Sequence, residues 1–286
     1  MHDFIREIAS FDDYALLDSG EGEKCERFGD IIVVRPDPLI LWPKADENGA
    51  WKDAHAIYTR EGEEGTWVFP RPLPSLWQIG HQDLQFLLRP TSFKHVGVFP
   101  EQAANWQWMQ KHLSSKSHVL NLFAYTGGAT LAAVQRGASV VHVDASGPVV
   151  NWAKENAVLS GLSGASVRWL VDDVMKFARR EVRRGNIYDM IVMDPPAFGR
   201  GPKNELWKFE RDLPELLSLC KSILNPKKGT MMLNAYSLGY PLLCLEQLVE
   251  TVFPKQTLME TVELVLQEKT SRAFALPTGV TVRVVW

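Results

Sequence analysis

The stretch Val119-Leu-Asn-Leu-Phe-Ala-Tyr-Thr-Gly-Gly-Ala129 decides the fold. It is an apolar run that changes into a polar turn with two glycines, and a helical pattern follows over residues 130–136. Gly127 and Gly128 lack a Cβ, so the backbone there can approach a ligand closely. A buried strand that enters such a turn and then a helix predicts a cofactor site at the carboxyl end of a parallel strand.

Two further strand ends carry polar residues. The apolar run Ser139-Val-Val-His-Val leads to Asp144, and an acidic residue at this place can accept hydrogen bonds from ribose hydroxyls. The next such run, residues 188–193, is followed by Asp194-Pro-Pro-Ala-Phe198. A dinucleotide dehydrogenase would show a fuller G-x-G-x-x-G, which this chain lacks. The three strand ends together predict a methyltransferase that uses S-adenosylmethionine.

The composition is typical of a globular protein. The chain has 286 residues, 45% of them hydrophobic and 23% charged, and it is long enough for two domains. No apolar run reaches the roughly 20 residues that span a bilayer, and the N-terminus does not resemble a signal peptide, so no membrane association is expected. The three cysteines are too few and too widely spaced for a disulfide framework or a metal site, which favours a cytoplasmic location.

Charge is distributed unevenly along the chain. Residues 1–105 hold 18 Asp and Glu against 10 Lys and Arg, a formal charge of −8, and the remainder holds 16 against 21, a charge of +5. These charges add to the net charge of −3 for the whole chain. A basic catalytic part is compatible with a polyanionic substrate, and a solvated charged surface is the alternative explanation.

Residues 1–92 predict a small β-rich N-terminal domain. Short β-type runs alternate there with turn clusters such as Asp18-Ser-Gly-Glu-Gly and Phe69-Pro-Arg-Pro-Leu-Pro. Four tryptophans in this region fit either the packing of a small sheet or a surface on which bases stack. They are Trp42, Trp51, Trp67 and Trp77.

Residues 93–286 predict the methyltransferase domain. From Val119 onward, strands alternate with helices, which indicates βαβ units and a parallel sheet. The expected strands are 118–123, 139–144, 166–171, 188–193 and 228–234, and the expected helices are 128–136, 147–160, 173–184, 211–224 and 240–252. Two later runs, 260–267 and 280–286, predict a closing antiparallel hairpin.

The candidate cofactor residues follow the first three strands. Asp144 is expected at the ribose, and Ser146 either assists there or caps the following helix, which is preferred. Asp172 and Asp173 can reach the adenine amino group, with Asp173 favoured and a plain helix N-cap as its alternative. The first turn contributes Phe123, Tyr125, Thr126, Gly127 and Gly128.

Residues 194–198, which we call the lip, are the candidate acceptor side. Methyl transfer must align the nucleophile about 3 Å from the methyl group and manage one proton. Pro195 and Pro196 fix an extended backbone whose carbonyls can accept hydrogen bonds from an amino group. Asp194 can contact both the acceptor and the cofactor, and Phe198 can stack on a ring. Two basic groups could meet a phosphate backbone, namely the stretch 179–184 and the set Arg200, Lys203, Lys208 and Arg211.

Several motifs resemble those of the class I methyltransferases that modify 23S ribosomal RNA, the cytosine-C5 and guanine-N7 enzymes. The resemblance covers about residues 90–240, and the segment Thr91–Gln102 is similar to one that closes over the cofactor there. It implies a Rossmann-like seven-stranded sheet, bound S-adenosylmethionine, Asn156 near the cofactor and ribosomal RNA as the partner. The motifs are Asn121-Leu-Phe-x-Tyr-Thr-Gly-Gly, Asp144-x-Ser146, Asn151-Trp-Ala-Lys-Glu-Asn156 and Asp194-Pro-Pro-x-Phe198.

The fifth strand departs from the cytosine-C5 pattern. That chemistry needs a cysteine thiolate, and the C5 enzymes carry Ser-Cys-Ser where this chain has Leu233-Asn-Ala-Tyr-Ser237. We therefore predict direct methylation of a nucleobase nitrogen of ribosomal RNA. The alternatives are a methyltransferase for a small molecule or a protein side chain, and a non-catalytic RNA-binding factor.

Overall fold

The computed structural model describes residues 5–61, 64–236, 239–254 and 258–286. It divides into two compact units. The first unit comprises Met1–Glu7, Ala104–Leu264 and Thr278–Trp286, and the second comprises Ile8–Ala103 and Val265–Pro277. Each unit thus combines segments that are far apart in the sequence. The expected domain boundary at residue 92 stays a prediction.

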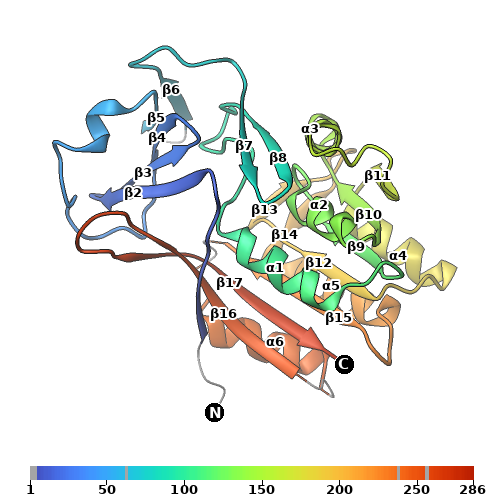
Figure 1. Cartoon of the computed structure of the whole chain (residues 1–286). Helices are drawn as coiled ribbons and strands as arrows, with labels where there is room; N and C mark the ends of the chain where they lie inside the picture. The colour runs from blue at the N-terminus through green and yellow to red at the C-terminus, as the bar shows by residue number, and fades with distance from the viewer. Residues whose placement is uncertain (1–4, 62–63, 237–238, 255–257) are drawn as a thin grey trace. The chain divides into compact units, whose positions relative to one another are not determined.

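The first unit is built on an eight-stranded sheet in the order β1-β16-β17-β15-β12-β9-β10-β11 (Figure 1). β9 pairs in parallel with β10 and β12, β12 pairs in parallel with β15, and β17 runs antiparallel to β15. Seven of the strands form the expected Rossmann-like methyltransferase sheet, and β1 adds an eighth at the edge. The strands are β1 (Ile5–Ile8), β9 (His118–Leu122), β10 (Ser139–Asp144), β11 (Val167–Val171), β12 (Met190–Met193), β15 (Thr230–Ala235), β16 (Leu258–Gln267) and β17 (Ala275–Val285).

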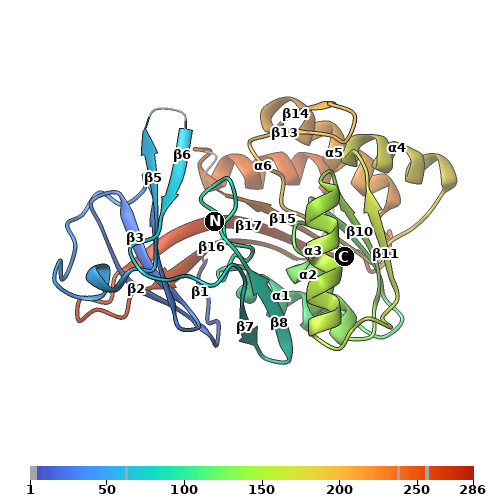
Figure 2. The ribbon, with the colours of Figure 1, turned by 90° about the horizontal axis from the view of Figure 1, so that it is seen from above.

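Helices cover both faces of this sheet. α1 (Gln102–His112), α2 (Gly128–Gln135) and α3 (Gly147–Leu159) lie on one face (Figure 2). α4 (Val174–Arg184), α5 (Phe209–Ile223) and α6 (Leu242–Val252) lie on the other. The core beneath the second set joins side chains of the sheet and the helices, among them Leu120, Ile191, Phe177, Leu216 and Val249. α2 to α6 begin and end within two residues of the expected bounds, because their apolar periodicity is strong.

A short hairpin follows the lip. β13 (Phe198–Arg200) and β14 (Leu206–Lys208) pair in antiparallel register, with Phe198 opposite Lys208. This hairpin was not expected from the sequence, since three-residue strands with mixed polar and apolar residues give no periodic signal.

The second unit is β-rich, as expected for the N-terminal region. β2 (Tyr14–Gly20), β3 (Glu23–Phe28), β4 (Ile31–Pro36), β5 (Ala56–Glu61) and β6 (Glu64–Val68) form one sheet, and β7 (Trp77–His81) and β8 (Leu84–Leu88) form another. A 3-10 helix, η1 (Ala50–Asp53), precedes β5.

β3 was not expected because its charged residues hide the strand pattern. Glu26 on this strand is fully buried, and its carboxylate accepts a hydrogen bond of 2.7 Å from the Arg35 guanidinium. Three of the four tryptophans donate their indole N–H groups within this unit, which favours packing over base stacking. The bonds run from Trp42 to Ser19, from Trp51 to Asp18 and from Trp67 to Thr91.

Candidate active site

The turn after β9 is strained. Phe123 and Tyr125 have positive φ angles of 54° and 48°, which non-glycine residues rarely adopt. A hydrogen bond of 2.9 Å from the Tyr125 backbone N–H to Asp144 Oδ2 holds the turn against the end of β10. Strain that the surroundings hold in place often marks a ligand site.

Both glycines of this turn are required by packing within the protein. A Cβ on Gly128 would overlap the Trp106 ring of α1. Gly127 has a φ of 90°, and a Cβ there would lie 3.0 Å from Ala153 Cβ on α3. The glycines therefore let α1 and α3 approach the turn, in addition to any role toward a ligand.

Two buried polar groups support the turn from behind. Asn156 on α3 donates a hydrogen bond of 3.0 Å to the Thr126 carbonyl, which gives this predicted residue a positioning role. Thr130 Oγ1 lies 3.0 Å from both Asn121 Nδ2 and His142 Nδ1. Burial lowers the pKa of His142 to about 3, so its ring is neutral at neutral pH. Sequence analysis did not propose Thr130 or His142, although a histidine inside an apolar run was a usable signal.

Asp144 ends β10 beside the turn. Its Oδ2 accepts the Tyr125 N–H, and its Oδ1 accepts the Ser146 N–H at 2.9 Å. Burial raises the pKa of Asp144, and these backbone hydrogen bonds lower it. Each carboxylate oxygen can accept a second hydrogen bond, which leaves room for ribose hydroxyls. Ser146 occupies the N-cap position of α3, but its side chain forms no capping hydrogen bond.

The two aspartates after β11 are engaged locally. Asp173 is the N-cap of α4 and accepts a hydrogen bond of 2.9 Å from the Lys176 N–H. Asp172 accepts from the Arg180 guanidinium and from the Asp173 N–H. The capping geometry that was the alternative for Asp173 is therefore present, and adenine contact by either residue stays a prediction.

The lip has two engaged carbonyls. The Pro196 carbonyl accepts the Trp207 indole N–H at 2.7 Å, and the Ala197 carbonyl accepts the Phe209 N–H at 3.0 Å. These two carbonyls hold the hairpin and α5, so the prediction that the proline carbonyls accept hydrogen bonds from an amino group is wrong for Pro196 and stays a prediction for Pro195. The exposed fraction of the Phe198 side chain is 54%, as a stacking residue requires.

Asp194 and Pro195 supply the remaining acceptors of the lip. Asp194 Oδ1 accepts a hydrogen bond of 2.7 Å from Asn234 Nδ2. Within the described part of the chain, neither Asp194 Oδ2 nor the Pro195 carbonyl receives a hydrogen bond. Burial raises the pKa of Asp194, and the bond from Asn234 lowers it.

The turn, Asp144 and the lip lie at one edge of the sheet. They follow β9, β10 and β12, which are adjacent parallel strands whose carboxyl ends meet there. The Phe123 and Trp207 rings, with centroids 4.8 Å apart, join the turn to the hairpin. The predicted cofactor side and acceptor side are therefore neighbours.

Most of the basic side chains near the site are paired. In the 179–184 stretch, the ion pairs are Arg179–Glu215, Arg180–Asp172 and Arg184–Glu181. Arg211 binds Asp212 and the Leu206 carbonyl. By contrast, the ammonium groups of Lys203 and Lys208 have no carboxylate partner among the described residues. Arg200 donates to Asn204 Oδ1 at 2.7 Å and likewise has no carboxylate partner in the described part of the chain, so Arg200, Lys203 and Lys208 remain for a phosphate.

Two of the three cysteines are buried and one is exposed. Cys25 and Cys220 are buried, and burial raises the pKa of each to about 12. Cys244 is exposed on α6. Within the described residues, no three His, Cys, Asp or Glu side chains gather as metal ligands, and no helix is both long and apolar enough to cross a membrane.

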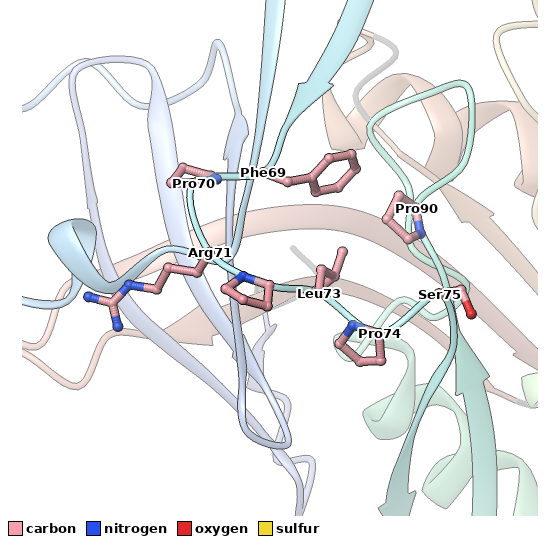
Figure 3. Close-up of a pocket in the computed structure, with 8 residues that line it drawn as sticks. Phe69, Pro70, Arg71, Leu73, Pro74, Ser75 and Pro90 are labelled. Carbon is pink, nitrogen blue, oxygen red and sulfur yellow. The ribbon is translucent and has the colours of Figure 1, made fainter.

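A separate pocket of about 690 Å³ lies in the second unit. Figure 3 shows Phe69 extending toward Pro90, whereas Arg71 points away. Arg71 pairs with Asp53 at 2.5 Å, and the other lining residues carry no titratable side chain. The lining of this pocket therefore offers no candidate acid, base or nucleophile for catalysis. Its lining is Phe69, Pro70, Arg71, Pro72, Leu73, Pro74, Ser75 and Pro90.

Comparison with known proteins identifies the class. Residues 52–251 match the family described as S-adenosylmethionine-dependent methyltransferase, and the chain belongs to this family. A solved SAM-dependent methyltransferase from Agrobacterium tumefaciens is 39% identical, covers 99% of this chain and 93% of that one, and has a TM-score of 0.93. The putative methyltransferase SMU.776, complexed with SAH, shares the fold at 19% identity and a TM-score of 0.72, over 92% of this chain and 72% of that one.

Curated relatives include two kinds of ribosomal RNA enzyme. Ribosomal RNA large subunit methyltransferase K/L of Shewanella amazonensis is 31% identical over 70% of this chain and 27% of that protein. Ribosomal RNA large subunit methyltransferase I of Photobacterium profundum is 37% identical over 46% of this chain and 33% of that protein. The chain spans a third or less of these relatives. The predicted family, fold and cofactor are confirmed at the level of the family.

Proposed function

We propose that the chain transfers the methyl group of S-adenosylmethionine to a nucleobase nitrogen of ribosomal RNA. The observation that carries this is the pair of acceptors at the lip, Asp194 Oδ2 and the Pro195 carbonyl, beside the cofactor turn. A nucleobase N–H or NH₂ group is the matching donor. Hydrogen bonds from it would orient the nitrogen for in-line attack.

The cofactor supplies an electrophilic methyl group, and this chain supplies binding and orientation. We assign the ribose to Asp144, whose carboxylate oxygens keep spare acceptor capacity. The turn from Phe123 to Gly128 would hold the remainder of the cofactor, with Asp172 or Asp173 at the adenine. Bound S-adenosylmethionine would supply the methyl group, and the acceptor nitrogen would give up its proton to Asp194 or to solvent.

Direct attack by nitrogen agrees with the cysteines of this chain. Addition of a thiolate to the base needs an ionised, accessible cysteine. Cys25 and Cys220 are protonated at neutral pH because their pKa values are about 12. The end of β15 carries Asn234 and Ala235 and no cysteine.

RNA is supported as the acceptor by the hairpin and by the relatives. The relatives named above are ribosomal RNA methyltransferases by name. On this chain, Lys203 and Lys208 can contact phosphates, and exposed Phe198 can stack on a base, with the Arg200 guanidinium 5.9 Å from its ring centroid.

The test is methyl transfer from labelled S-adenosylmethionine to ribosomal RNA from a strain that lacks this gene, with nucleoside mass spectrometry to identify the product. Asp194→Ala should abolish transfer and leave cofactor affinity near wild type, whereas Asp83→Ala, an exposed change in the second unit, should leave both unchanged. Full activity of Asp194→Ala would remove the lip from the mechanism. Efficient, salt-insensitive methylation of a neutral small molecule would overturn the RNA assignment.

A further inference from the structure

Four buried polar side chains connect Asp194 to Arg283 on β17, and we call them the relay. Asn234 Nδ2 donates to Asp194 Oδ1 at 2.7 Å, and Thr281 Oγ1 donates to Asn234 Oδ1 at 2.9 Å. Asn105 Nδ2 donates to Thr281 Oγ1 at 3.0 Å, and Arg283 Nη2 donates to Asn105 Oδ1 at 2.8 Å. The exposed fraction of each relay residue is 3% or less.

The sheet register creates the relay. Met193 and Leu233 are paired on parallel strands β12 and β15, so the next residues, Asp194 and Asn234, follow side by side. Asn234 is also paired across the antiparallel ladder with Thr281 on β17. α1 packs on this face and contributes the remaining amide, Asn105, so five polar groups from the lip, β15, β17 and α1 meet there.

The direction of the relay agrees with the groups at its two ends, a guanidinium that can only donate and a carboxylate that, when ionised, can only accept. A guanidinium can only donate, so Asn105 must turn its carbonyl oxygen to Arg283 and its NH₂ group to Thr281. The Thr281 hydroxyl then donates its single hydrogen to the Asn234 carbonyl oxygen, and Asn234 presents its NH₂ group to Asp194. The orientation of both amides thus agrees with Arg283 at one end and with ionised Asp194 at the other.

The starting end is firmly held. Arg283 Nη2 lies 2.7 Å from Glu7, and Arg283 Nη1 lies 3.9 Å from Glu260. Trp108 donates its indole N–H to Glu260 at 2.9 Å, and its ring centroid is 5.2 Å from the guanidinium. These contacts balance the buried charge of Arg283, and they are separate from the hydrogen bond that Arg283 donates to Asn105.

We propose that this one-way chain of hydrogen bonds is a positioning device that fixes the orientation of Asp194. It commits Oδ1 to Asn234 and leaves Oδ2 to accept from the methyl-accepting group. The inference rests on the role given to Asp194 under the proposed function. Asn234, Thr281, Asn105 and Arg283 are positioning residues, since they act through Asp194.

The relay also affects the ionisation of Asp194. Burial raises the pKa of this carboxyl group and the Asn234 hydrogen bond lowers it, and among the described residues no charged group adds a comparable effect. If Asn234 turns its oxygen toward Asp194, two acceptors face each other, which favours the protonated form. The acid limb of the pH–kcat profile should then move to higher pH.

Asn105→Asp reverses the relay while keeping its shape. The new carboxylate still accepts from Arg283, but it cannot donate to Thr281. The Thr281 hydroxyl is then expected to donate to it, and Asn234 to flip. We expect a folded protein with unchanged cofactor affinity, a kcat that is lower by about ten- to a hundredfold at neutral pH, and an acid limb at higher pH.

Thr281→Val removes the central hydroxyl of the relay and should also lower kcat and move the acid limb to higher pH. Thr281→Ser keeps a hydroxyl at this position and should retain the wild-type kcat and acid limb. Thr278→Val is the matched control. Thr278 is also a buried threonine of β17, but its hydroxyl donates to the Leu264 carbonyl at 2.9 Å and is not part of the relay. It should lose stability without a change in the pH profile.

The wild-type profile in Asn105→Asp, or equal losses of kcat in Thr281→Val and Thr278→Val, would overturn the relay. A second measurement, carbon-13 NMR titration of the Asp194 carboxyl group, needs no RNA. The titration midpoint of Asp194 should rise in Asn105→Asp and Thr281→Val and should stay at the wild-type value in Thr278→Val. An unchanged midpoint in the first two variants would also overturn the proposal. If the wild-type protein methylates no RNA but the two variants show this shift in the titration midpoint, the proposed substrate fails and the relay stands.

Discussion

Asp144 and Asp194 stand at the ends of neighbouring strands and are held by different partners. Asp144 accepts two backbone N–H groups, so it shapes the turn as well as offering acceptors to a ligand. Asp194 accepts one side-chain amide, so its orientation depends on tertiary structure. The sequence predicted both residues from their places at strand ends, but it could not show the partners, because Asn234, Thr281 and Asn105 come from segments far apart in the chain.

Asp144→Ala should weaken S-adenosylmethionine binding by about 1–3 kcal/mol, the scale of lost hydrogen bonds to a charged group. Because burial raises the pKa of Asp144, affinity for the cofactor should fall with decreasing pH at a higher pH than for an exposed aspartate. Calorimetry across pH measures both effects. Asp144→Asn, which keeps one acceptor oxygen, should lose less, and unchanged affinity in folded Asp144→Ala would remove Asp144 from the site.

Replacement of the cysteines should leave turnover intact. Cys25→Ala, Cys220→Ala and Cys244→Ser remove two buried, protonated thiols and one exposed thiol on α6. Because nitrogen attack needs no thiolate, the triple variant should keep wild-type kcat provided that it folds. A cysteine-dependent loss of kcat in a stable protein, or a covalent adduct with 5-fluorocytosine RNA, would contradict this.

At the scale of elements, apolar periodicity predicted most of the strands and helices that build the core, but it missed the hairpin beside the site. The strands from β9 onward that form the large sheet, and helices α2 to α6, were predicted because each buries an apolar face, whereas the mostly exposed edge strand β1 was not. The β13–β14 hairpin was not predicted, because its position depends on the hydrogen bond from the Trp207 indole to the Pro196 carbonyl. β3 was not predicted because buried ion pairs around Glu26 replace the usual alternation of apolar and polar residues along a strand.

The hairpin should contribute to RNA binding through Lys203 and Lys208. Lys203→Ala and Lys208→Ala should each weaken RNA binding and reduce the salt-dependence slope by about one unit, as expected for one lost phosphate contact. Lys221→Ala is the control, since Lys221 is an exposed lysine in the last turn of α5, away from the lip. Binding titrations at several salt concentrations measure the slopes, and equal slopes for all three variants would exclude the hairpin as a phosphate site.

At the scale of the whole molecule, neither unit is a continuous stretch of chain. The second unit takes residues 265–277 from the C-terminal region, where Glu268 and Arg272 join residues near the start of the chain. Arg272 donates to Glu268 at 2.8 Å and to Asp18 at 3.0 Å, and Ser19 donates to Glu268. Sequence composition suggested a boundary in the region of residue 92, but it carried no signal for an ion pair that connects positions about 250 residues apart.

Arg272→Ala should lower the free energy of unfolding by about 3 kcal/mol, because it leaves the fully buried Glu268 carboxylate without its cation. Desolvation alone would raise the pKa of Glu268, but its hydrogen bonds, with that from Arg272 the largest, leave it below the usual value for glutamate. The stability from this group is therefore present at neutral pH and lost as pH falls through the folded-state pKa. The difference between wild type and Arg272→Ala, measured by urea denaturation, should be greatest near pH 7 and shrink in acid. Arg71→Ala, which breaks the exposed pair with Asp53, should cost under about 1 kcal/mol at any pH, and an equal cost for both variants would contradict the structural role of Arg272.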